Sequence, residues 1–270
     1  MYQKSFLKWP GGKYRALPRL LAAFPRGARF VEPFVGSGTV FLNTDYREYL
    51  LCDANPDLIG VFRLLRREPE AFIRRCKALF TPASNTAERY YELRAAFNNA
   101  SSLRERAALF IYCNRHGYNG LVRYNAQGGY NVPFGRYAAP HFPEAEMRAF
   151  SAKCRSCAVE FAAQDFSATF ARLRTGDVVY ADPPYVPLSR TASFTAYAGL
   201  DFGMEQQCAL AEAARQAAAR GIPVILSNHD TADTRRLYAG AALLSFPVRR
   251  SISCNGAARG DAAELLAVFS

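Results

Sequence analysis

Short apolar segments with the character of strands alternate with helical segments at both ends of this 270-residue chain. Residues 29–32 and 49–53 are typical of strands, and a glycine-rich turn and a helix separate them. Residues 12–23 carry leucines at helical spacing. The same rhythm continues with strands at 158–161, 178–181, 224–226 and 263–269 and a helix at 205–220. This alternation predicts an α/β fold built on a doubly wound parallel sheet.

Residues 57–144 interrupt the alternation. They begin with arginine-rich helical stretches and end in a segment dense in Asn, Gly and Tyr, residues 114–137. The sequence Gln127-Gly128-Gly129 within that segment predicts the turn of a two-stranded ribbon. We therefore expect one domain made of residues 1–56 and 145–270, with residues 57–144 inserted into it as a second, mainly helical domain.

The net charge and the cysteine content limit which kinds of partner and metal the chain is expected to bind. Lys and Arg number 34 against 23 Asp and Glu, which leaves a net charge of +11 and favours a polyanion such as nucleic acid. No apolar run approaches the roughly 18–20 residues that span a bilayer, and residues 1–15 lack the pattern of a signal peptide, so we expect a cytoplasmic protein. The seven cysteines are scattered, and Cys154 and Cys157 lack the partners of a zinc site. We predict free thiols and no metal.

A glycine turn follows the first strand, in the sequence from Val31 to Gly38. Ligands of open α/β sheets bind beyond the carboxyl ends of the strands, and glycine lets the backbone approach them closely. Asp53 ends the second strand and can accept hydrogen bonds from ribose hydroxyls. This combination suits NAD as readily as S-adenosylmethionine, and a plain tight turn would also explain it.

The sequence Asp182-Pro183-Pro184-Tyr185 after a buried strand is more specific. Two prolines fix the backbone and leave the Pro183 carbonyl beside the Asp182 carboxylate, and Tyr185 adds a flat ring nearby. Two acceptors and a stacking ring suit an exocyclic amine on an aromatic base, because hydrogen bonds to that amine strengthen as it becomes cationic. The alternative is a Pro-Pro stop after a strand with Tyr185 as core filler.

These segments, in this order, resemble the Dam-type DNA adenine-N6 methyltransferases of the alpha group almost from end to end. The resemblance rests on residues 6–13, 31–38, 40–43, 53, 114–124, 131–137, 182–185, 227–230 and 249–253. It implies a Rossmann-like methyltransferase sheet with an inserted target-recognition domain carrying a β-hairpin. It also implies methyl transfer from S-adenosylmethionine to N6 of a flipped adenine in double-stranded DNA, within GATC, by a bacterial or phage enzyme that is monomeric in solution.

The resemblance also assigns roles to residues. Trp9, Lys13, Asp53 and Asp182 are implied as cofactor contacts, Glu32, Phe34 and Gly36 as the shape of the pocket, and Asp165 and Phe166 as neighbours of the cofactor's adenine ring. Lys8, Asn119, Leu121, Arg123, Pro133 and Tyr137 are implied as base readers, and Arg94, Arg115, Asn125, Asn131 and Arg136 as phosphate contacts.

The chemistry of single residues supports parts of this assignment. Arg123 can make a bidentate contact to guanine, and Tyr118 can act as an aromatic wedge in the duplex. We expect His116 and His229 to be structural rather than catalytic. Three other functions are alternatives. The chain could be a non-catalytic DNA-binding protein, or a methyltransferase that acts on free nucleotide, on RNA or on a protein amide. It could also be an NAD-dependent dehydrogenase. These alternatives are disfavoured by the intact tetrapeptide, by the Asp at position 182 and by the basic insertion.

Overall fold

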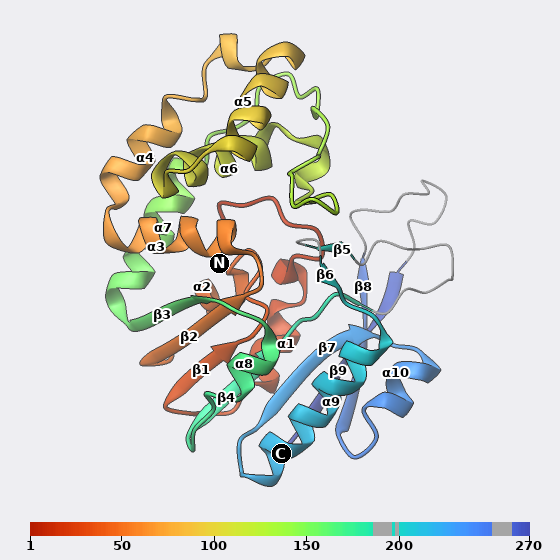
Figure 1. The fold of residues 1–270 in the computed structure, drawn as a ribbon. Coiled ribbons are helices and arrows are strands. Elements are labelled where there is room, and N and C mark those ends of the chain that lie inside the picture. The colour runs from red at the N-terminus through yellow and green to blue at the C-terminus, as the bar shows by residue number, and fades with distance from the viewer. Residues whose placement is uncertain (186–195, 198–199, 250–260) are drawn as a thin grey trace.

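A computed structural model describes residues 1–185, 196–197, 200–249 and 261–270 of the chain (Figure 1). Its centre is a seven-stranded sheet with the order β3-β2-β1-β4-β7-β9-β8. The strands are β1 (Arg29–Glu32), β2 (Glu48–Asp53), β3 (Ala158–Ala163), β4 (Asp177–Ala181), β7 (Val224–His229), β8 (Ala242–Arg249) and β9 (Asp261–Phe269). The first five strands in that order are parallel, and β9 is antiparallel to both of its neighbours. β5 (Ala196–Tyr197) and β6 (Leu200–Asp201) form a separate two-stranded sheet.

Helices cover both faces of the sheet and build a layer at one end of it (Figure 1). On one face lie α1 (Leu17–Ala23), α2 (Thr39–Asn43), α3 (Pro56–Arg67) and α7 (Glu144–Ser156), and on the other α8 (Phe166–Phe170), α9 (Met204–Ala219) and α10 (Ala232–Leu237). The end layer contains α4 (Pro69–Lys77), α5 (Ala87–Asn99) and α6 (Leu103–His116). Short 3₁₀ turns lie at η1 (Lys13–Arg15), η2 (Pro82–Ser84) and η3 (Tyr118–Gly120).

The central strands β4 and β7 are buried along almost their whole length because both faces of the sheet are covered. Successive residues of one strand point to opposite faces, so Val178 and Tyr180 belong to one hydrophobic core and Val179 and Ala181 to the other. All four side chains are at most 1% exposed. The expected α/β fold is therefore confirmed, whereas the expectation of a wholly parallel sheet is wrong at β9, which runs antiparallel to both of its neighbours.

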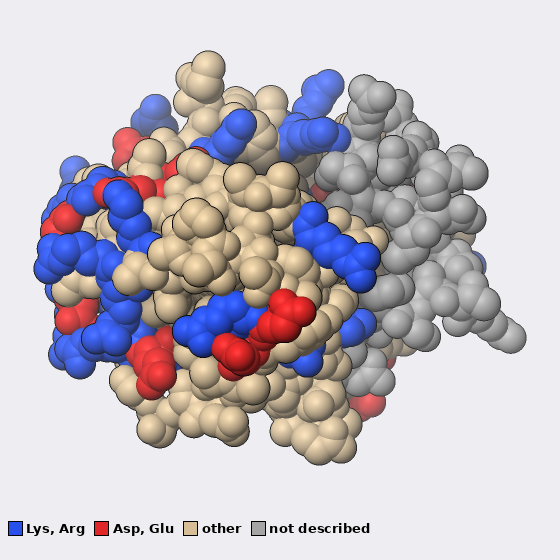
Figure 2. Space-filling view, turned by 90° about the horizontal axis from the view of Figure 1, so that it is seen from above, with Lys and Arg blue, Asp and Glu red and all other residues tan. Residues whose placement is uncertain are grey.

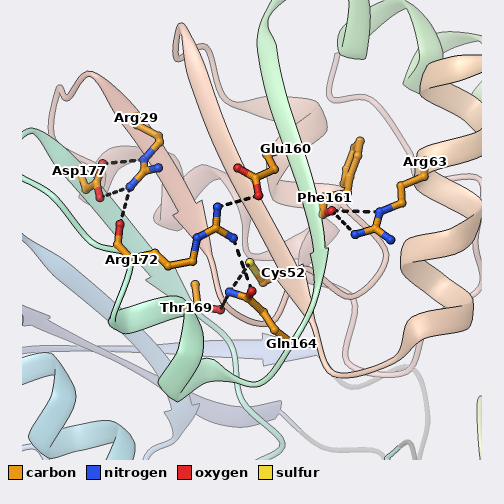
Figure 3. A network of polar contacts seen from close by, with 9 residues as sticks. All are labelled: Arg29, Cys52, Arg63, Glu160, Phe161, Gln164, Thr169, Arg172 and Asp177. Atoms are coloured by element: carbon orange, nitrogen blue, oxygen red, sulfur yellow. Dashed lines mark hydrogen bonds and ion pairs between the residues drawn. The ribbon is translucent and has the colours of Figure 1, made fainter.

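Polar contacts fasten the strands and the covering helices to one another (Figure 3). Arg29 of β1 donates to both carboxylate oxygens of Asp177 in β4, at 2.9 and 2.7 Å. Arg63 of α3 donates twice to the carbonyl oxygen of Phe161 in β3. Arg63 thus holds a helix on the sheet, so not every arginine of the basic segment is available to a partner.

The end layer shares a continuous hydrophobic core with one face of the sheet, and α3 packs against both. A buried polar cluster adds to this contact. Asp57, in the first turn of α3, accepts hydrogen bonds from Arg106 Nε and Nη2 at 2.5 and 3.0 Å and from the Tyr124 hydroxyl at 2.7 Å. Asp57 is 8% exposed. One carboxylate therefore joins the sheet-covering helix, the end layer and the segment that contains Arg123.

Replacing Asp57 with Ala is expected to lower the free energy of unfolding by about 2–4 kcal/mol, because the Tyr124 hydroxyl and the half-buried Arg106 lose their partner. Urea unfolding followed by circular dichroism measures the change. Glu92→Ala is the matched control, because it removes an exposed ion pair with Arg89 and should change stability by less than about 1 kcal/mol. Equal stability of the two variants would contradict a structural role for this cluster.

Two features differ from the sequence expectations. The expected ribbon around residues 127–129 is not confirmed, since the segment forms a tight turn closed by one isolated bridge between Tyr124 and Tyr130. Backbone hydrogen bonds cross the turn, from Asn125 to Gly129 and from Asn131 to Arg123. Other backbone groups bind α5, where the Asn98 side chain binds both backbone groups of Tyr130 and the Tyr90 hydroxyl donates to the Val132 carbonyl. β8 was not predicted at all. Of the segments that carry the resemblance, residues 250–253 lie outside the described residues.

Candidate active site

The candidate site lies where the sheet changes winding direction. β1 and β4 are neighbours in the sheet, and the chain runs from β1 through β2 to β3 on one side and from β4 to β7 on the other. Ligands of doubly wound sheets bind beyond the carboxyl ends of the strands at this switch point. The glycine turn follows β1 there, and the tetrapeptide 182–185 follows β4. The topology therefore brings together the two motifs that the sequence singled out.

The N-terminal segment packs against the glycine turn. The Ser5 hydroxyl donates to the Ser37 carbonyl at 2.7 Å. Gly36 has a φ of +48°, and a Cβ atom at this position would stand 2.9 Å from Nε1 of Trp9. Only glycine therefore permits both this backbone conformation and the close approach of the indole. Trp9 is the single tryptophan of the chain, so its fluorescence reports on this site alone.

Asp53 connects the glycine turn with the end of β2. Its carboxylate accepts from the backbone N–H groups of Gly36 and Asn55, at 3.0 Å each. Burial raises the pKa of Asp53 to about 6, although these two hydrogen bonds lower it. A carboxylate has further lone pairs after two such bonds, so Asp53 can still accept from a ligand hydroxyl.

Four residues form a charged cluster at the end of β4. Lys13 Nζ lies 2.9 Å from Asp182 Oδ1, 3.6 Å from Glu264 Oε1 and 4.6 Å from the centre of the Tyr185 ring. The Tyr185 hydroxyl donates to Glu264 Oε1 at 2.5 Å. Burial opposes the charge of Lys13, but the carboxylates of Asp182 and Glu264 outweigh burial and raise its pKa. One ammonium group is therefore shared by two carboxylates beside an aromatic ring.

Burial also acts on the acids of the site. It raises the pKa of Asp182 to about 6, while Lys13 lowers it. It raises the pKa of Glu32 far above its ordinary value, and the nearby Asp182 carboxylate adds to this effect. Glu32 is 2% exposed, and its Oε1 atom has no hydrogen-bond partner among the described residues. A buried acceptor without a partner fits a ligand that carries a positive charge or a hydrogen-bond donor.

Aromatic rings line the same end of the sheet. Phe34 and Phe166 lie nearly parallel with ring centres 5.9 Å apart, and Phe202 packs edge-on against both. Asp165 precedes them as the N-cap of α8, where its carboxylate accepts from the Ala168 N–H at 2.8 Å. These rings offer the apolar faces that a flat heterocycle requires.

The backbone of the tetrapeptide 182–185 accepts a hydrogen bond from a buried side-chain amide. Gln207 in α9 is 1% exposed, and its Nε2 donates to the Pro184 carbonyl at 2.7 Å. The Asn228 side chain donates in turn to Gln207 Oε1. The Pro183 carbonyl accepts no hydrogen bond from any described residue. His229 packs edge-on against the Tyr185 ring with centres 4.6 Å apart, so it helps to order the site.

Four of the residues expected to contact DNA form one cluster near the N-terminal segment. Lys8 Nζ lies 3.7 Å above the centre of the Tyr137 ring and donates to the Arg115 carbonyl. The Asn119 N–H donates to the Tyr137 hydroxyl at 2.9 Å. Burial, together with the charge of Arg115, lowers the pKa of Lys8 to about 8. Gly120 permits this arrangement, because a Cβ atom there would stand 2.2 Å from Lys8 Cβ.

A second group surrounds Arg123. Its Nε donates to Asn131 Oδ1 at 2.7 Å, which orients the guanidinium group. Arg94 donates to the Val132 carbonyl, and the Asn125 side chain accepts from two N–H groups of the turn 125–129. Tyr118, Pro133 and Arg136 are exposed and Leu121 is half-buried. Several of the expected DNA residues thus lie in two local groups, and some of them also make hydrogen bonds within the protein.

His116 has no place in either group. It is 1% exposed, packs between the rings of Tyr112 and Phe80, and shares a hydrogen bond between its Nδ1 and the Tyr112 carbonyl. Burial lowers its pKa to about 4, so it remains neutral near pH 7. His116 is a packing residue of the end layer.

Three residues of the site were missed by the sequence analysis. Gln207 could have been found from the sequence, because it is a polar residue at helical spacing with the buried Leu210, Ala211 and Ala214. Phe202 and Glu264 carry none, because each is brought to the site by tertiary structure alone.

Basic side chains are spread over the end of the molecule that carries α4, α5 and α6 (Figure 2). Acidic side chains lie among them, several of them in ion pairs such as Arg104–Glu68 and Arg148–Glu70. Within the described part of the chain, no group of three potential metal ligands comes together, and no helix is long and apolar enough to cross a membrane.

A wound sheet with a glycine turn, an acid at the end of β2 and a carboxylate-bearing tetrapeptide at the switch point defines an α/β protein with a polar site where ligands of such sheets bind. The chain belongs to the D12 class N6 adenine-specific DNA methyltransferase family, whose model matches residues 9–252.

The chain is also similar in sequence to named proteins over nearly its whole length. The DNA adenine methylase of Vibrio cholerae serotype O1 is 49% identical over 269 residues, covering 99% of this chain and 96% of that protein. The DNA adenine methylase of Escherichia coli strain K12 is 48% identical over 266 residues, covering 98% and 95%. That of Serratia marcescens is 45% identical over 267 residues, covering 98% of both chains.

Proposed function

We propose that the protein transfers a methyl group from S-adenosylmethionine to the N6 amino group of an adenine flipped out of double-stranded DNA, within the sequence GATC. The observation that carries this proposal is the juxtaposition of the Asp182 carboxylate, the Pro183 carbonyl and the Tyr185 ring at the switch point. Family membership and the curated DNA adenine methylases support the reaction, and GATC follows from the resemblance to Dam-type enzymes.

The residues beside the tetrapeptide fit the proposed cofactor. Glu32 offers a buried oxygen that has no hydrogen-bond partner among the described residues, and Asp53 retains lone pairs for ribose hydroxyls. Phe34 and Phe166 offer apolar faces for an adenine ring. Trp9 and Gly36 complete the wall of this pocket. When bound there, S-adenosylmethionine supplies an electrophilic methyl group.

The chain's own residues orient the amine. Asp182 and the Pro183 carbonyl each accept one N–H of the amino group, so the nitrogen lone pair is left to face the methyl donor. Both hydrogen bonds become charge-assisted as the nitrogen acquires positive charge, and they therefore stabilise the transition state more than the ground state. Tyr185 stacks against the extruded base and offsets part of the few kcal/mol that extrusion costs.

Residues 57–144 are proposed as the target-recognition domain, inserted between the two parts of a catalytic domain at 1–56 and 145–270. Lys8, Asn119, Leu121, Arg123, Pro133 and Tyr137 are proposed to read bases, Arg94, Arg115, Asn125, Asn131 and Arg136 to contact phosphates, and Tyr118 to fill the gap left by the flipped base. The clustering of Lys8 with Tyr137 and of Arg123 with Asn131 supports this assignment, because preformed contacts limit the entropy lost on binding.

Methylation of a plasmid in a bacterial host without adenine methylation tests the reaction and its target together. Sequencing that detects modified bases should find N6-methyladenine at GATC in cells that express the protein. Methylation of a different adenine context would refute the target but not the reaction, and unmodified plasmid with soluble protein present would refute the reaction.

The rate should depend on the protonation of Asp182. Because burial raises its pKa to about 6, protonation below that pH removes the charged acceptor. With saturating cofactor, kcat/KM for DNA should therefore fall about tenfold per pH unit below pH 6 and level off above it. The charged groups around Asp182 are Lys13 and Glu264, with Glu32 nearby. Residual activity of Asp182→Asn should be flat over this range. A decline that persists in Asp182→Asn would assign the titration to another group.

Arg123→Ala should relax selectivity at one base pair. A bidentate contact to guanine contributes about 1–3 kcal/mol of discrimination, so discrimination should fall on the order of 10- to 100-fold there and remain at the other positions. The measurement is kcat/KM on duplexes that each carry one substituted base pair. Arg89→Ala, which removes an exposed arginine paired with Glu92, should leave the selectivity profile unchanged. An unchanged profile in Arg123→Ala would exclude Arg123 as a reader.

A further inference from the structure

Glu264 enters the proposed active site from the antiparallel strand. It pairs in register with His229, the last residue of β7, so it stands at the carboxyl edge of the parallel strands. Its side chain is buried, with 7% of the residue exposed. Its Oε1 atom accepts from the Tyr185 hydroxyl at 2.5 Å and lies 3.6 Å from Lys13 Nζ. Glu264 thus contacts two of the groups that surround Asp182.

Lys13 and the target amine would share the carboxylate of Asp182. Lys13 Nζ lies 2.9 Å from Oδ1 of Asp182, and it also donates to the Gly11 carbonyl. In the proposed reaction the Asp182 carboxylate accepts from the adenine amine. The Asp182 carboxylate keeps lone pairs for the amine, but the buried ion pair draws its negative charge toward Lys13, so a second anion that shares Lys13 leaves more of that charge for the amine. Glu264 is the second carboxylate within reach.

We propose that Glu264 is a positioning residue of the methyl-transfer site, which fixes the Tyr185 ring through its hydroxyl and takes over Lys13 when the target amine binds Asp182. This inference rests on the proposed function. The shift requires little motion, because the ammonium is already shared between the two carboxylates. The hydroxyl of Tyr185 is available to donate, since burial and the neighbouring carboxylates raise its pKa far above the ordinary value and keep it protonated.

Glu264→Gln separates the two contributions. The amide oxygen of Gln can still accept from the Tyr185 hydroxyl, but a neutral side chain cannot replace Asp182 as partner of Lys13. We expect kcat to fall roughly 10- to 100-fold with little change in KM for DNA, because the amine is then held less well at Asp182. Glu264→Ala loses both interactions and should lower kcat further. Glu212→Gln, on the exposed side of α9, is the matched control and should behave as the wild type.

Two binding measurements separate positioning from loss of structure. Quenching of Trp9 fluorescence by S-adenosylmethionine should give similar affinities for wild type and Glu264→Gln. Duplex DNA with 2-aminopurine at the target position reports extrusion of the base, and its signal should be retained in Glu264→Gln and weakened in Glu264→Ala. In a Tyr185→Phe background, Glu264→Ala should cost less in kcat than in the wild type, because part of its action passes through the missing hydroxyl.

The inference is overturned if Glu264→Gln and Glu264→Ala both turn over at the wild-type rate. It is also overturned if both variants lose Trp9-reported cofactor binding in proportion to their loss of kcat, which would mark a structural role. Failure of the proposed function looks different, because the wild-type protein itself would then leave adenine in DNA unmodified.

Discussion

Asp182→Ala should abolish methyl transfer while leaving DNA binding nearly intact. The variant removes one of the two acceptors proposed for the target amine, and loss of one preorganised hydrogen bond to a developing charge lowers kcat on the order of 10²–10³-fold. The actual loss should reach at least this range, because Lys13 loses its 2.9 Å contact with Asp182 at the same time and is left with the Glu264 carboxylate at 3.6 Å as its anionic partner among the described residues. Single-turnover methylation of a GATC duplex measures the rate, and a filter or gel assay measures affinity.

Two further variants complete this experiment: Asp182→Asn is the conservative substitution and Asp233→Ala is the control. The Asn side chain keeps an acceptor oxygen without its negative charge, so its kcat should lie between those of the wild type and Asp182→Ala. Asp233 is an exposed acid of α10 that pairs with Arg236, and its removal should leave kcat unchanged. A wild-type rate in Asp182→Ala would remove the tetrapeptide from the mechanism.

DNA affinity should depend steeply on salt. If the protein neutralises roughly 6–10 phosphates, its affinity falls about 10³–10⁵-fold between 50 and 200 mM salt, because bound counterions are released from DNA on association. The net charge of +11 and the basic side chains over α4, α5 and α6 support this expectation (Figure 2). Fluorescence anisotropy of a labelled duplex at a series of salt concentrations gives the slope.

Single substitutions test which charges contribute to that slope. Arg136→Asn removes an exposed charge at a residue with a φ of +51°, a conformation that Asn tolerates, so the slope should fall by about one without loss of structure. Arg220→Gln, at the C-terminal end of α9, should leave the slope as it is. A weak salt response of the wild type, or equal slopes for both variants, would contradict the phosphate assignment.

Much of the fold could be predicted because the parallel strands contain short runs of apolar residues between turn residues. Val178 to Ala181 is such a run, and all of it is buried. β8 could not be predicted in the same way. It is an edge strand whose residues alternate only weakly between buried and exposed, and Pro247 interrupts its strand character. The ribbon expected at residues 127–129 is not confirmed, since pairing across the turn is limited to a few backbone hydrogen bonds and both backbone groups of Tyr130 bind the Asn98 side chain of α5.

The residues of the site likewise fall into those that the sequence predicts and those that it does not. Trp9, Gly36, Asp53 and Asp182 stand in recognisable motifs, and the parallel topology determines which edge of the sheet they occupy. Glu264 could not be found by that reasoning, because it lies near the beginning of a strand rather than at the end of one. It reaches the site only because β9 runs in the opposite direction to β7. The ion pair of Lys13 with Asp182 was also beyond the sequence, since it depends on side-chain distances that no motif specifies.

The charged cluster joins residues from nearly the whole length of the chain. Lys13 precedes the first strand, and Glu264 belongs to the last, so the cluster closes only after β9 has inserted between β7 and β8. Contacts between such distant positions form late in folding, because a long loop must be closed first. A nascent polypeptide emerging from the ribosome therefore lacks the contact between Lys13 and Glu264 until β9 has been synthesised.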